Sequence, residues 1–508
     1  MPIRDFNTLK FIWFNYRKYK ATKSSKSIVL LEYTKMQPTI LATSLLVRVL
    51  TKKHIGSTFI AYTFRDNYKY YPHLKLIYKS FGVEIKRFQI SNKHKISAQE
   101  KVSEIIDLNL DNDDLLTFKI NDMMIGDLIY DHYLRHHKSP TLSLKDDSYK
   151  NTLQEGLEQY FFFEDYMQNN DVKAVHVSHQ CYFQAIPLRV AVNKNIDVFA
   201  CHNSDCQRFN KDRLWGWKEC RDYRSIFNSL TEKHKARALQ WSKSRIEKRF
   251  SGDVGVDMYY SKKSAFSEIN RNIRVIKKSD KIKILIAAHC FFDAPNGFGL
   301  SLFPDFYIWL SKLGDMSNKT DYDWYIKTHP DLIPGNNEIV NEILSKYPRI
   351  KLLDQNTSHK QIVHDGIDFV LTTHGTVGFE YAAMGITVIN ASLTNPHIGY
   401  DFNIHPSSRK EYINLLLNLT DKVKIEISNN DIYEFYYMRH YYFNTSDWLL
   451  LNRDFYIKNS NKLMSSKIYG DYIDSTRNNK VEMNKRLNTF HEFVMGDDEL
   501  MTHHGYRN

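Results

Sequence analysis

The chain has 508 residues, 42% hydrophobic and 14% aromatic, which excludes a disordered protein and is enough for more than one domain. Its formal charge of +12 favours acidic partners such as nucleotides or anionic lipid surfaces. The five cysteines have no CxxC or metal-ligand spacing and fit a reducing compartment. No signal peptide opens the chain and no run of roughly 20 apolar residues occurs, so we expect a cytoplasmic protein, at most touching the inner face of the cytoplasmic membrane.

The first hundred residues are rich in Lys and Arg and contain three alternating strand and helix units. Residues 11–20 mix aromatic and basic side chains, which fits a helix on an anionic membrane surface or a helix packed on the protein's own sheet. Strands are predicted at 27–33, 58–64 and 83–90, and helices at 38–51 and 76–81. This alternation predicts a Rossmann-like domain, and the missing GxGxxG motif argues against a dinucleotide there.

A predicted helix follows at Gly126 and carries charged residues at helical spacing. Asp127, Asp131 and Arg135 fall on one face at i, i+4 and i+8. The set is either an ordinary ion pair between Asp131 and Arg135 or part of a site between two domains.

Two more strands of the first domain end in polar residues. The strands 172–177 and 196–200 lead into His179 with Tyr182 and into His202. Parallel strands present their carboxyl ends at one edge of a sheet, so we expect His179, Tyr182, His202 and Arg135 to line an acceptor site.

The rest of the chain divides into a connector, a second domain and a tail. Residues 231–280 are polar, basic and helical in pattern. Strands are predicted at 282–288, 322–327, 350–353, 367–371 and 386–390. We therefore expect domains at 1–230 and 281–420 on either side of the connector, and a tail at 421–508 that is helical to about 465 and disordered at its end.

The second domain holds the stretch that best indicates a ligand. A strand ends in Lys-Thr-His-Pro at 327–330, and another breaks at 372–376 into Thr-Thr-His-Gly-Thr before a short helix. Free N–H groups at a helix start attract phosphate, so the second break predicts a phosphate socket, although Thr376 could simply cap the helix.

These motifs, with the loop His-Cys-Phe-Phe-Asp-Ala-Pro-Asn at 289–296, resemble a family of bacterial capsule and surface polysaccharide glycosyltransferases with two facing Rossmann-like domains, of the GT-B type. Phe292 and Asn296 depart from the family's loop. The Gly-Asp-x-x-Tyr-Asp-x-x-Leu-Arg stretch at 126–135 is also similar to one found in such enzymes. The resemblance covers residues 280 to 400 well and the first half loosely.

The resemblance implies an α/β fold with two Rossmann-like domains across a cleft and a role for each candidate residue. Lys327 and His329 would stabilise the departing phosphate, Glu380 would bind a ribose hydroxyl, and Asp293 would take the acceptor's proton, with Asp127 or Asp131 as second choices. The donor-binding candidates are His289, Asn296, Gly297, Lys327, His329, Pro330, Thr373, His374, Gly375, Thr376 and Glu380.

The expected reaction is sugar transfer from a nucleotide-sugar donor to a surface polysaccharide, glycolipid or other glycan. The resemblance points to a cytidine-linked acidic sugar such as Kdo or a sialic-acid relative. No compact metal-ligand cluster occurs, so we expect no metal and no cofactor, and no nucleic-acid motif is present. A teichoic-acid-type glycerophosphate transferase, a sugar-nucleotide epimerase and a non-catalytic scaffold remain as alternatives.

Overall fold

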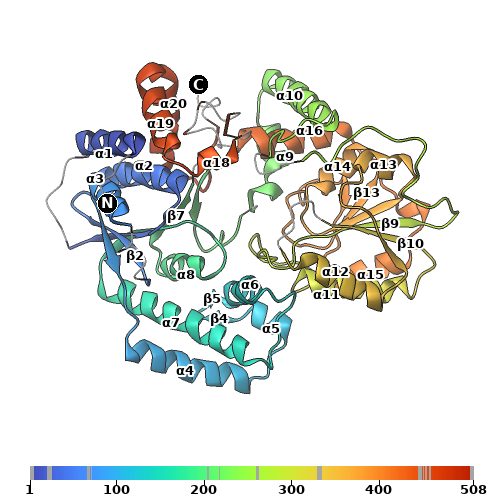
Figure 1. Cartoon of the computed structure of the whole chain (residues 1–508), viewed down its shortest axis with the longest axis horizontal. Coiled ribbons are helices and arrows are strands. Elements are labelled where there is room, and N and C mark those ends of the chain that lie inside the picture. Colours follow the sequence, from blue (N-terminus) through green and yellow to red (C-terminus); the bar gives the residue numbers. More distant parts are fainter. Residues whose placement is uncertain are drawn as a thin grey trace.

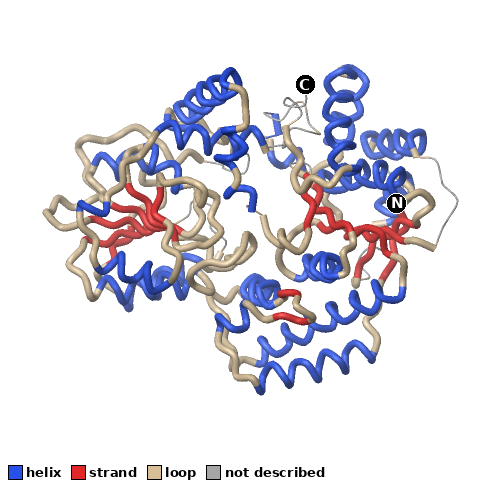
Figure 2. The backbone as a smooth tube through the Cα atoms, turned by 180° about the vertical axis from the view of Figure 1, so that it is seen from behind, coloured by secondary structure: helices blue, strands red, loops and turns tan. Residues whose placement is uncertain are grey.

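The computed structural model describes residues 5–19, 26–65, 69, 71–202, 205–216, 218–258, 263–328, 334–443, 449, 451, 455–456 and 459–503. Two separate sheets, each flanked by helices, form two domains (Figure 1, Figure 2). Each sheet has six strands in the order 3-2-1-4-5-6 of its own domain, which is the order of a doubly wound Rossmann fold. The predicted α/β fold with two Rossmann-like domains is confirmed.

The N-terminal sheet is parallel except for its last strand, which pairs antiparallel with its neighbour. Its strands, in spatial order, are β3 (Val83–Arg87), β2 (Thr58–Thr63), β1 (Ile28–Glu32), β6 (Val172–Val177), β7 (Asp197–Cys201) and β8 (Cys206–Phe209). A separate hairpin is formed by β4 (Lys119–Ile120) and β5 (Met123–Met124).

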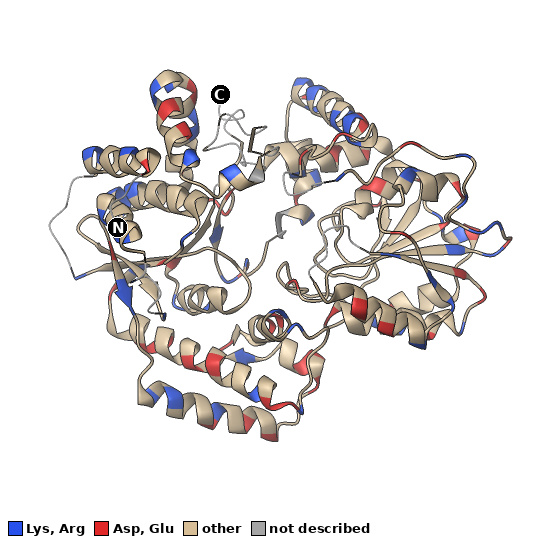
Figure 3. Cartoon of the chain, in the orientation of Figure 1, with Lys and Arg blue, Asp and Glu red and all other residues tan. Residues whose placement is uncertain are grey.

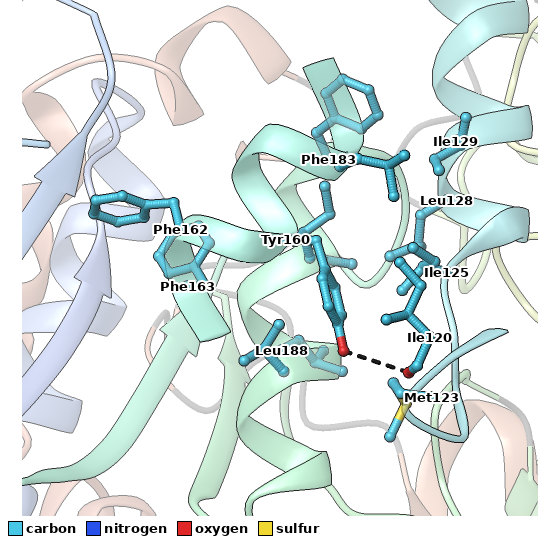
Figure 4. Close-up of a cluster of buried hydrophobic side chains, with 14 of the residues drawn as sticks. Ile120, Met123, Ile125, Leu128, Ile129, Tyr160, Phe162, Phe163, Phe183 and Leu188 are labelled. Carbon is cyan, nitrogen blue, oxygen red and sulfur yellow. Dashed lines mark hydrogen bonds between the residues drawn. The ribbon is translucent and has the colours of Figure 1, made fainter. Parts of the chain in front are cut away.

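Helices cover both faces of this sheet because its central strand alternates between two apolar layers. Leu30 packs into one layer, and Val29 and Leu31 pack into the other. The first layer includes aromatic and aliphatic side chains around Tyr160, whose hydroxyl donates to the Ile120 carbonyl (Figure 4). The helices are α1 (Phe6–Lys18), α2 (Gln37–Lys53), α3 (Pro72–Ser80), α4 (Asn92–Asp107), α5 (Asn112–Leu116), α6 (Gly126–His137), α7 (Asp147–Asn169), α8 (Ile186–Asn193) and α9 (Tyr223–Asn228), with 3-10 turns η2 (Phe183–Ala185) and η3 (Lys218–Arg221).

Helix α6 begins where two pieces of backbone come unusually close. A Cβ atom at Gly126 would lie 1.7 Å from the Leu115 carbonyl oxygen, so only glycine fits there. This contact fixes the start of the helix that carries Asp127, Asp131 and Arg135.

The C-terminal sheet is parallel throughout. Its strands, in spatial order, are β11 (Ile350–Leu352), β10 (Asp323–Lys327), β9 (Lys283–Ala287), β12 (Phe369–Thr372), β13 (Thr387–Asn390) and β14 (Asn403–Ile404). Its helices are α11 (Phe306–Ser317), α12 (Asn336–Lys346), α13 (His359–His364), α14 (Val377–Ala383) and α15 (Arg409–Leu417), with the 3-10 turn η4 (Asp421–Val423). Gly385, at φ 81°, follows the C-cap of α14 and ends the helix.

The connector is helical only in its first part, which corrects the helical pattern expected over residues 231–280. Helix α10 (Glu232–Phe250) ends before Gly252 and Gly255, which both have positive φ. The described residues that follow run without a helix along the C-terminal domain, where the Val275 and Ile276 amides donate to Asp365.

The tail returns to the N-terminal domain, and its described helices continue well beyond 465. Helix α16 (Asn429–Tyr437) packs against α10, whereas α19 and α20 pack against α1 and α2 (Figure 1). The remaining tail elements are the π-helix η5 (Met438–Tyr442), α18 (Ser460–Leu463), α19 (Lys467–Asn478) and α20 (Lys480–Met495). No described helix is both long enough and apolar enough to cross a bilayer.

Candidate functional site

Each sheet has one point where strand order reverses, and polar side chains meet at both points. In the N-terminal sheet, between β1 and β6, the Ser178 amide donates to Glu32 Oε2 at 2.6 Å. In the C-terminal sheet, between β9 and β12, His289 Nε2 lies 3.1 Å from Thr372 Oγ1. Doubly wound folds bind ligands beyond the strand ends at such points, so these two places are the candidate halves of a site.

Asp293 is the carboxylate at which the two domains meet. Its side chain is 61% exposed, and Oδ1 accepts a hydrogen bond from the Tyr182 hydroxyl at 3.2 Å and lies 3.5 Å from Arg135 Nη1. Both partners belong to the N-terminal domain: Tyr182 lies in the loop just before η2, and Arg135 lies on α6. The structure therefore brings together three predicted site residues that lie up to 158 positions apart in sequence.

The backbone on both sides of this contact is strained. Tyr182 has φ 58° and ψ −167°, a region that bulky residues rarely adopt, and Ala294 has φ 38°. Such outliers persist only where the surroundings hold them, and they are frequent at functional sites. Their position supports this junction, rather than a surface loop elsewhere, as the candidate site.

Asp131 forms a second bridge between the domains. Asn296 donates to Asp131 Oδ1 from its side chain at 3.0 Å, and its backbone amide donates to Oδ2 at 3.2 Å. Burial raises the pKa of Asp131 well above its ordinary value, although the Asn296 hydrogen bonds oppose this shift. The alternative ion pair between Asp131 and Arg135 is not formed, because Arg135 turns to Asp293.

Asp127, the third charged residue of α6, points into its own domain. Arg189 Nη2 lies 2.7 Å from Asp127 Oδ2, and Trp215 Nε1 donates to the same oxygen at 2.8 Å. Both Asp127 and Arg189 are buried. These bonds occupy the carboxylate and favour a structural role over proton transfer.

The two predicted acceptor histidines lie together at the carboxyl ends of β6 and β7. The rings of His179 and His202 are 5.7 Å apart at 79°, and His179 Nδ1 lies 3.0 Å from the Ser178 hydroxyl. Burial, with a smaller contribution from His202, lowers the pKa of His179 to about 4. His179 is therefore neutral at pH 7 and can accept a hydrogen bond, while burial disfavours its protonation.

The predicted phosphate socket at the end of β12 is compact. The Gly375 amide donates to Thr372 Oγ1 at 3.2 Å, and the Thr373 amide donates to His289 Nε2 at 3.4 Å. His374 lies 4.8 Å from the His289 ring, and burial lowers the pKa of His374 to about 4. Thr376 does not cap α14 through its side chain, so the simple capping role is not found.

One buried polar atom of this socket lacks a hydrogen-bond partner among the described residues, namely Thr373 Oγ1. Lys327, 6% exposed at the end of β10, makes no hydrogen bond or ion pair with a described residue, and the charges nearest to it are the carboxylates of Glu380 and Asp354. Burial lowers the pKa of Lys327, although these carboxylates oppose the shift. Buried hydroxyls are nearly always paired, so the Thr373 hydroxyl points to a ligand at this socket.

Glu380 is held in a buried ion pair. Arg249 at the end of α10 binds Glu380 Oε1 through both Nε, at 3.0 Å, and Nη2, and His359 Nδ1 lies 3.4 Å from Oε2. Burial tends to raise the pKa of Glu380, but Arg249 and His359 outweigh it and hold this pKa below its ordinary value. Its predicted ribose-binding role stays a prediction, since a ribose would have to share the carboxylate with Arg249.

The remaining predicted residues are placed as follows. The Gly297 amide donates to the Ala294 carbonyl at 2.9 Å within the loop of Asp293. His329 and Pro330 lie outside the described residues. No group of three or more metal-ligating side chains occurs in the described part of the chain.

Sequence reasoning missed Glu32, Arg249 and His359. Burial raises the pKa of Glu32, which ends β1 directly at the point where strand order reverses. A lone acidic residue closing an apolar strand was the only local signal for it. Arg249 and Glu380 are 131 positions apart, and no local pattern joins them.

Comparison with known proteins gives no sequence match, since no protein-family model and no curated protein matches the chain. Among solved structures the chain is similar to the Thermosulfurimonas dismutans KpsC beta Kdo 2,4 transferase, with a TM-score of 0.31 and 10% identity over 52% of this chain and 79% of that one. It is similar to the KpsC beta Kdo 2,7 transferase of the same organism, with a TM-score of 0.31 and 14% identity over 55% of this chain and 85% of that one. It is also similar to the Methanocaldococcus jannaschii UDP-GlcNAc 2-epimerase in complex with UDP-GlcNAc and UDP, with a TM-score of 0.27 and 13% identity over 80% of this chain and 97% of that one. Similarity at these TM-scores does not support a function, and the fold assignment rests on the strand order of the two sheets.

Proposed function

We propose that this chain is a glycosyltransferase that moves a sugar from a nucleotide-sugar donor to a surface polysaccharide, glycolipid or other glycan acceptor. The donor binds at the C-terminal domain and the acceptor at the N-terminal domain. A donor with a cytidine monophosphate leaving group and an acidic sugar such as Kdo or a sialic-acid relative is the first choice, on the motif resemblance at 289–296, 327–330 and 372–380.

One observation carries the proposal: the Thr373 hydroxyl at the end of β12 is buried without a hydrogen-bond partner among the described residues. A hydroxyl donates readily to an anion such as a nucleotide phosphate, and the ammonium of Lys327, at the end of β10 in the same sheet, supplies positive charge at this edge. The backbone amides at the start of α14, which follows the carboxyl end of β12, add partial positive charge near Thr373.

In the proposed reaction Asp293 is the base. Its carboxylate removes the proton of an acceptor hydroxyl, whose oxygen bonds to the anomeric carbon while the bond from that carbon to the donor phosphate oxygen breaks. Tyr182 and Arg135 keep the carboxylate oriented from the other domain. Lys327 stabilises the charge that develops on the departing phosphate, as preorganised donors do in other group transfers.

The test is a panel of radiolabelled nucleotide sugars, with cytidine, uridine and guanosine donors, incubated with and without glycan and glycolipid acceptors. The proposal expects label in an acceptor and free nucleotide in equal amounts. Label that stays on the nucleotide but in an isomeric sugar would identify an epimerase instead. Absence of both products and of nucleotide binding by calorimetry would support a non-catalytic scaffold.

A further inference from the structure

Helix α1 buries one face against the protein and exposes apolar side chains on the opposite face. Thr8, Phe11 and Asn15 face the protein. The opposite side is a stripe at i, i+3, i+7 and i+10 that exposes Phe6 (73%), Leu9 (46%), Trp13 (48%) and Tyr16 (51%). Four large apolar side chains in line on one exposed helix face mark a contact surface rather than scattered exposure.

The buried face fixes the helix, so the exposed stripe is part of the folded protein. Phe11 stacks on Tyr469 of α19 with ring centroids 4.2 Å apart, and Asn15 Nδ2 donates to Ser80 of α3 at 3.3 Å. Asp5 caps the first turn by accepting from the Thr8 amide. Helix α1 lies at the periphery of the N-terminal domain, on the side away from the C-terminal domain (Figure 1).

The charged residues of α1 itself are Lys10, Arg17 and Lys18, with Asp5 at its N-cap. Arg17 lies 3.7 Å above the Trp13 ring, and Lys10 pairs with Asp474 of α19. Figure 3 marks the Lys and Arg positions of α1 in blue along the ribbon. Within residues 1–26 the only acidic residue is Asp5, against seven basic ones: Arg4, Lys10, Arg17, Lys18, Lys20, Lys23 and Lys26.

We propose that α1 docks the protein on an anionic lipid bilayer, with Phe6, Leu9, Trp13 and Tyr16 inserted at the level of the headgroups and the basic residues on anionic lipid. Apolar and aromatic side chains beside Lys and Arg are the chemistry of interfacial helices. A second copy of the chain is disfavoured, because it would bring the same positive charge against this face. The inference does not depend on the proposed reaction.

The test is flotation of the full chain with vesicles of phosphatidylcholine alone or with 30% phosphatidylglycerol. We expect binding to the anionic vesicles only, weakened at 0.5 M NaCl because screening shortens the reach of the lipid charge. The double variant Leu9→Ser, Trp13→Ser should lower the partition coefficient at least about tenfold. The double variant Arg17→Glu, Lys18→Glu should lower it about fivefold or more for each charge replaced. Since these side chains are exposed, the variants should keep the wild-type melting temperature.

The matched control is Ile273→Ser with Leu352→Ser, which removes two equally exposed apolar side chains (55% and 49%) from the other domain and should leave partition unchanged. Equal flotation of the α1 variants and wild type would overturn the proposal, as would wild-type failure to bind anionic vesicles. A wild-type dimer by light scattering that the Leu9→Ser, Trp13→Ser variant turns into a monomer would assign the face to self-association instead.

Discussion

Asp293 is the residue on which the proposed chemistry depends most. Asp293→Asn keeps the side-chain shape, and its amide oxygen can still accept from Tyr182, but it removes the base. We expect kcat to fall by about 10²-fold or more, with KM for the donor little changed. Steady-state kinetics at saturating acceptor measure this. A near-normal kcat would remove Asp293 from the mechanism and leave Asp131 as the next candidate, since the Asp127 carboxylate is occupied by Arg189 and Trp215.

Lys327 gives a second residue-scale prediction. Its ammonium acts mainly as the phosphate departs, so Lys327→Ala should lower kcat by about 10²- to 10³-fold and weaken nucleotide binding less. Thr373→Val is the companion variant, because it removes only the unpaired hydroxyl and should act on donor affinity. Titration calorimetry with cytidine monophosphate beside the kinetics separates the two effects. Equal losses in binding and in kcat/KM for Lys327→Ala would assign it to uniform donor binding.

The ion pair of Glu380 with Arg249 predicts how stability depends on pH. Because the folded-state pKa of Glu380 lies below the ordinary 4.5, its contribution is complete above that pH and is lost as pH falls through the folded-state pKa. Glu380→Gln leaves Arg249 buried without its charge partner and should cost about 3 to 5 kcal/mol at pH 7. Urea unfolding at pH 7, 5 and 3 checks this: the gap between the two proteins should narrow toward pH 3. A constant gap would mean that the pair is not responsible.

Among the elements, α20 shows how much the tail contributes. Phe493 is fully buried in the layer that covers the N-terminal sheet, whereas Val481 on the same helix is 87% exposed. Phe493→Ala should cost about 3 to 5 kcal/mol of unfolding free energy, and Val481→Ala should stay within about 0.5 kcal/mol. Denaturant melts of both variants test whether the tail is part of the folding unit. Equal, small effects would show that α20 is dispensable.

The sequence predicts the buried strands more reliably than the helices, because buried strands and helices differ in how clearly their apolar residues stand out. Buried parallel strands are apolar runs, so β1, β9 and β12 stand out locally. Helix α4 buries only His94, Ala98, Val102 and Ile105, a weak apolar face in a polar sequence, and it was not predicted. The tail helices bury tyrosines that read as polar until their packing partners are known.

The sequence predicts which residue types lie at the strand ends of the candidate site, but not which side chains contact one another there. Strand ends in a parallel sheet converge, which is why the sequence predicts candidates at Asp293, Lys327, Thr373, His179 and His202, each in the loop at or after a strand end. Which carboxylate faces which partner depends on how the two domains dock, and that contact is spread over residues more than 100 positions apart.

At the scale of the whole molecule, the contact through Asp131 should make domain packing depend on pH. The raised pKa of Asp131 means that its favourable contribution is present at low pH and is lost as pH rises through the folded-state pKa. Asp131→Asn keeps an acceptor for the Asn296 amide without the charge, so the variant should gain in melting temperature relative to wild type between pH 5 and pH 8. Calorimetric scans at pH 5 and pH 8 measure the melting temperatures of wild type and Asp131→Asn, and Asp293→Asn serves as the control at an exposed carboxylate. A difference in melting temperature that is the same at both pH values would mean that Asp131 keeps one protonation state across this range.

The return of the tail to the first domain also sets an order of assembly on the ribosome. The C-terminal sheet is built from one continuous stretch, 283–404, and can close as soon as that stretch has emerged. The N-terminal domain must wait for α19 and α20, which are made about 450 residues after α1, roughly 20 to 90 s later at ordinary rates of synthesis. During that interval Phe11 lacks its stacking partner Tyr469, and the face of α2 that α20 covers stays open. We therefore expect the second-made half of the chain to mature before the first-made half.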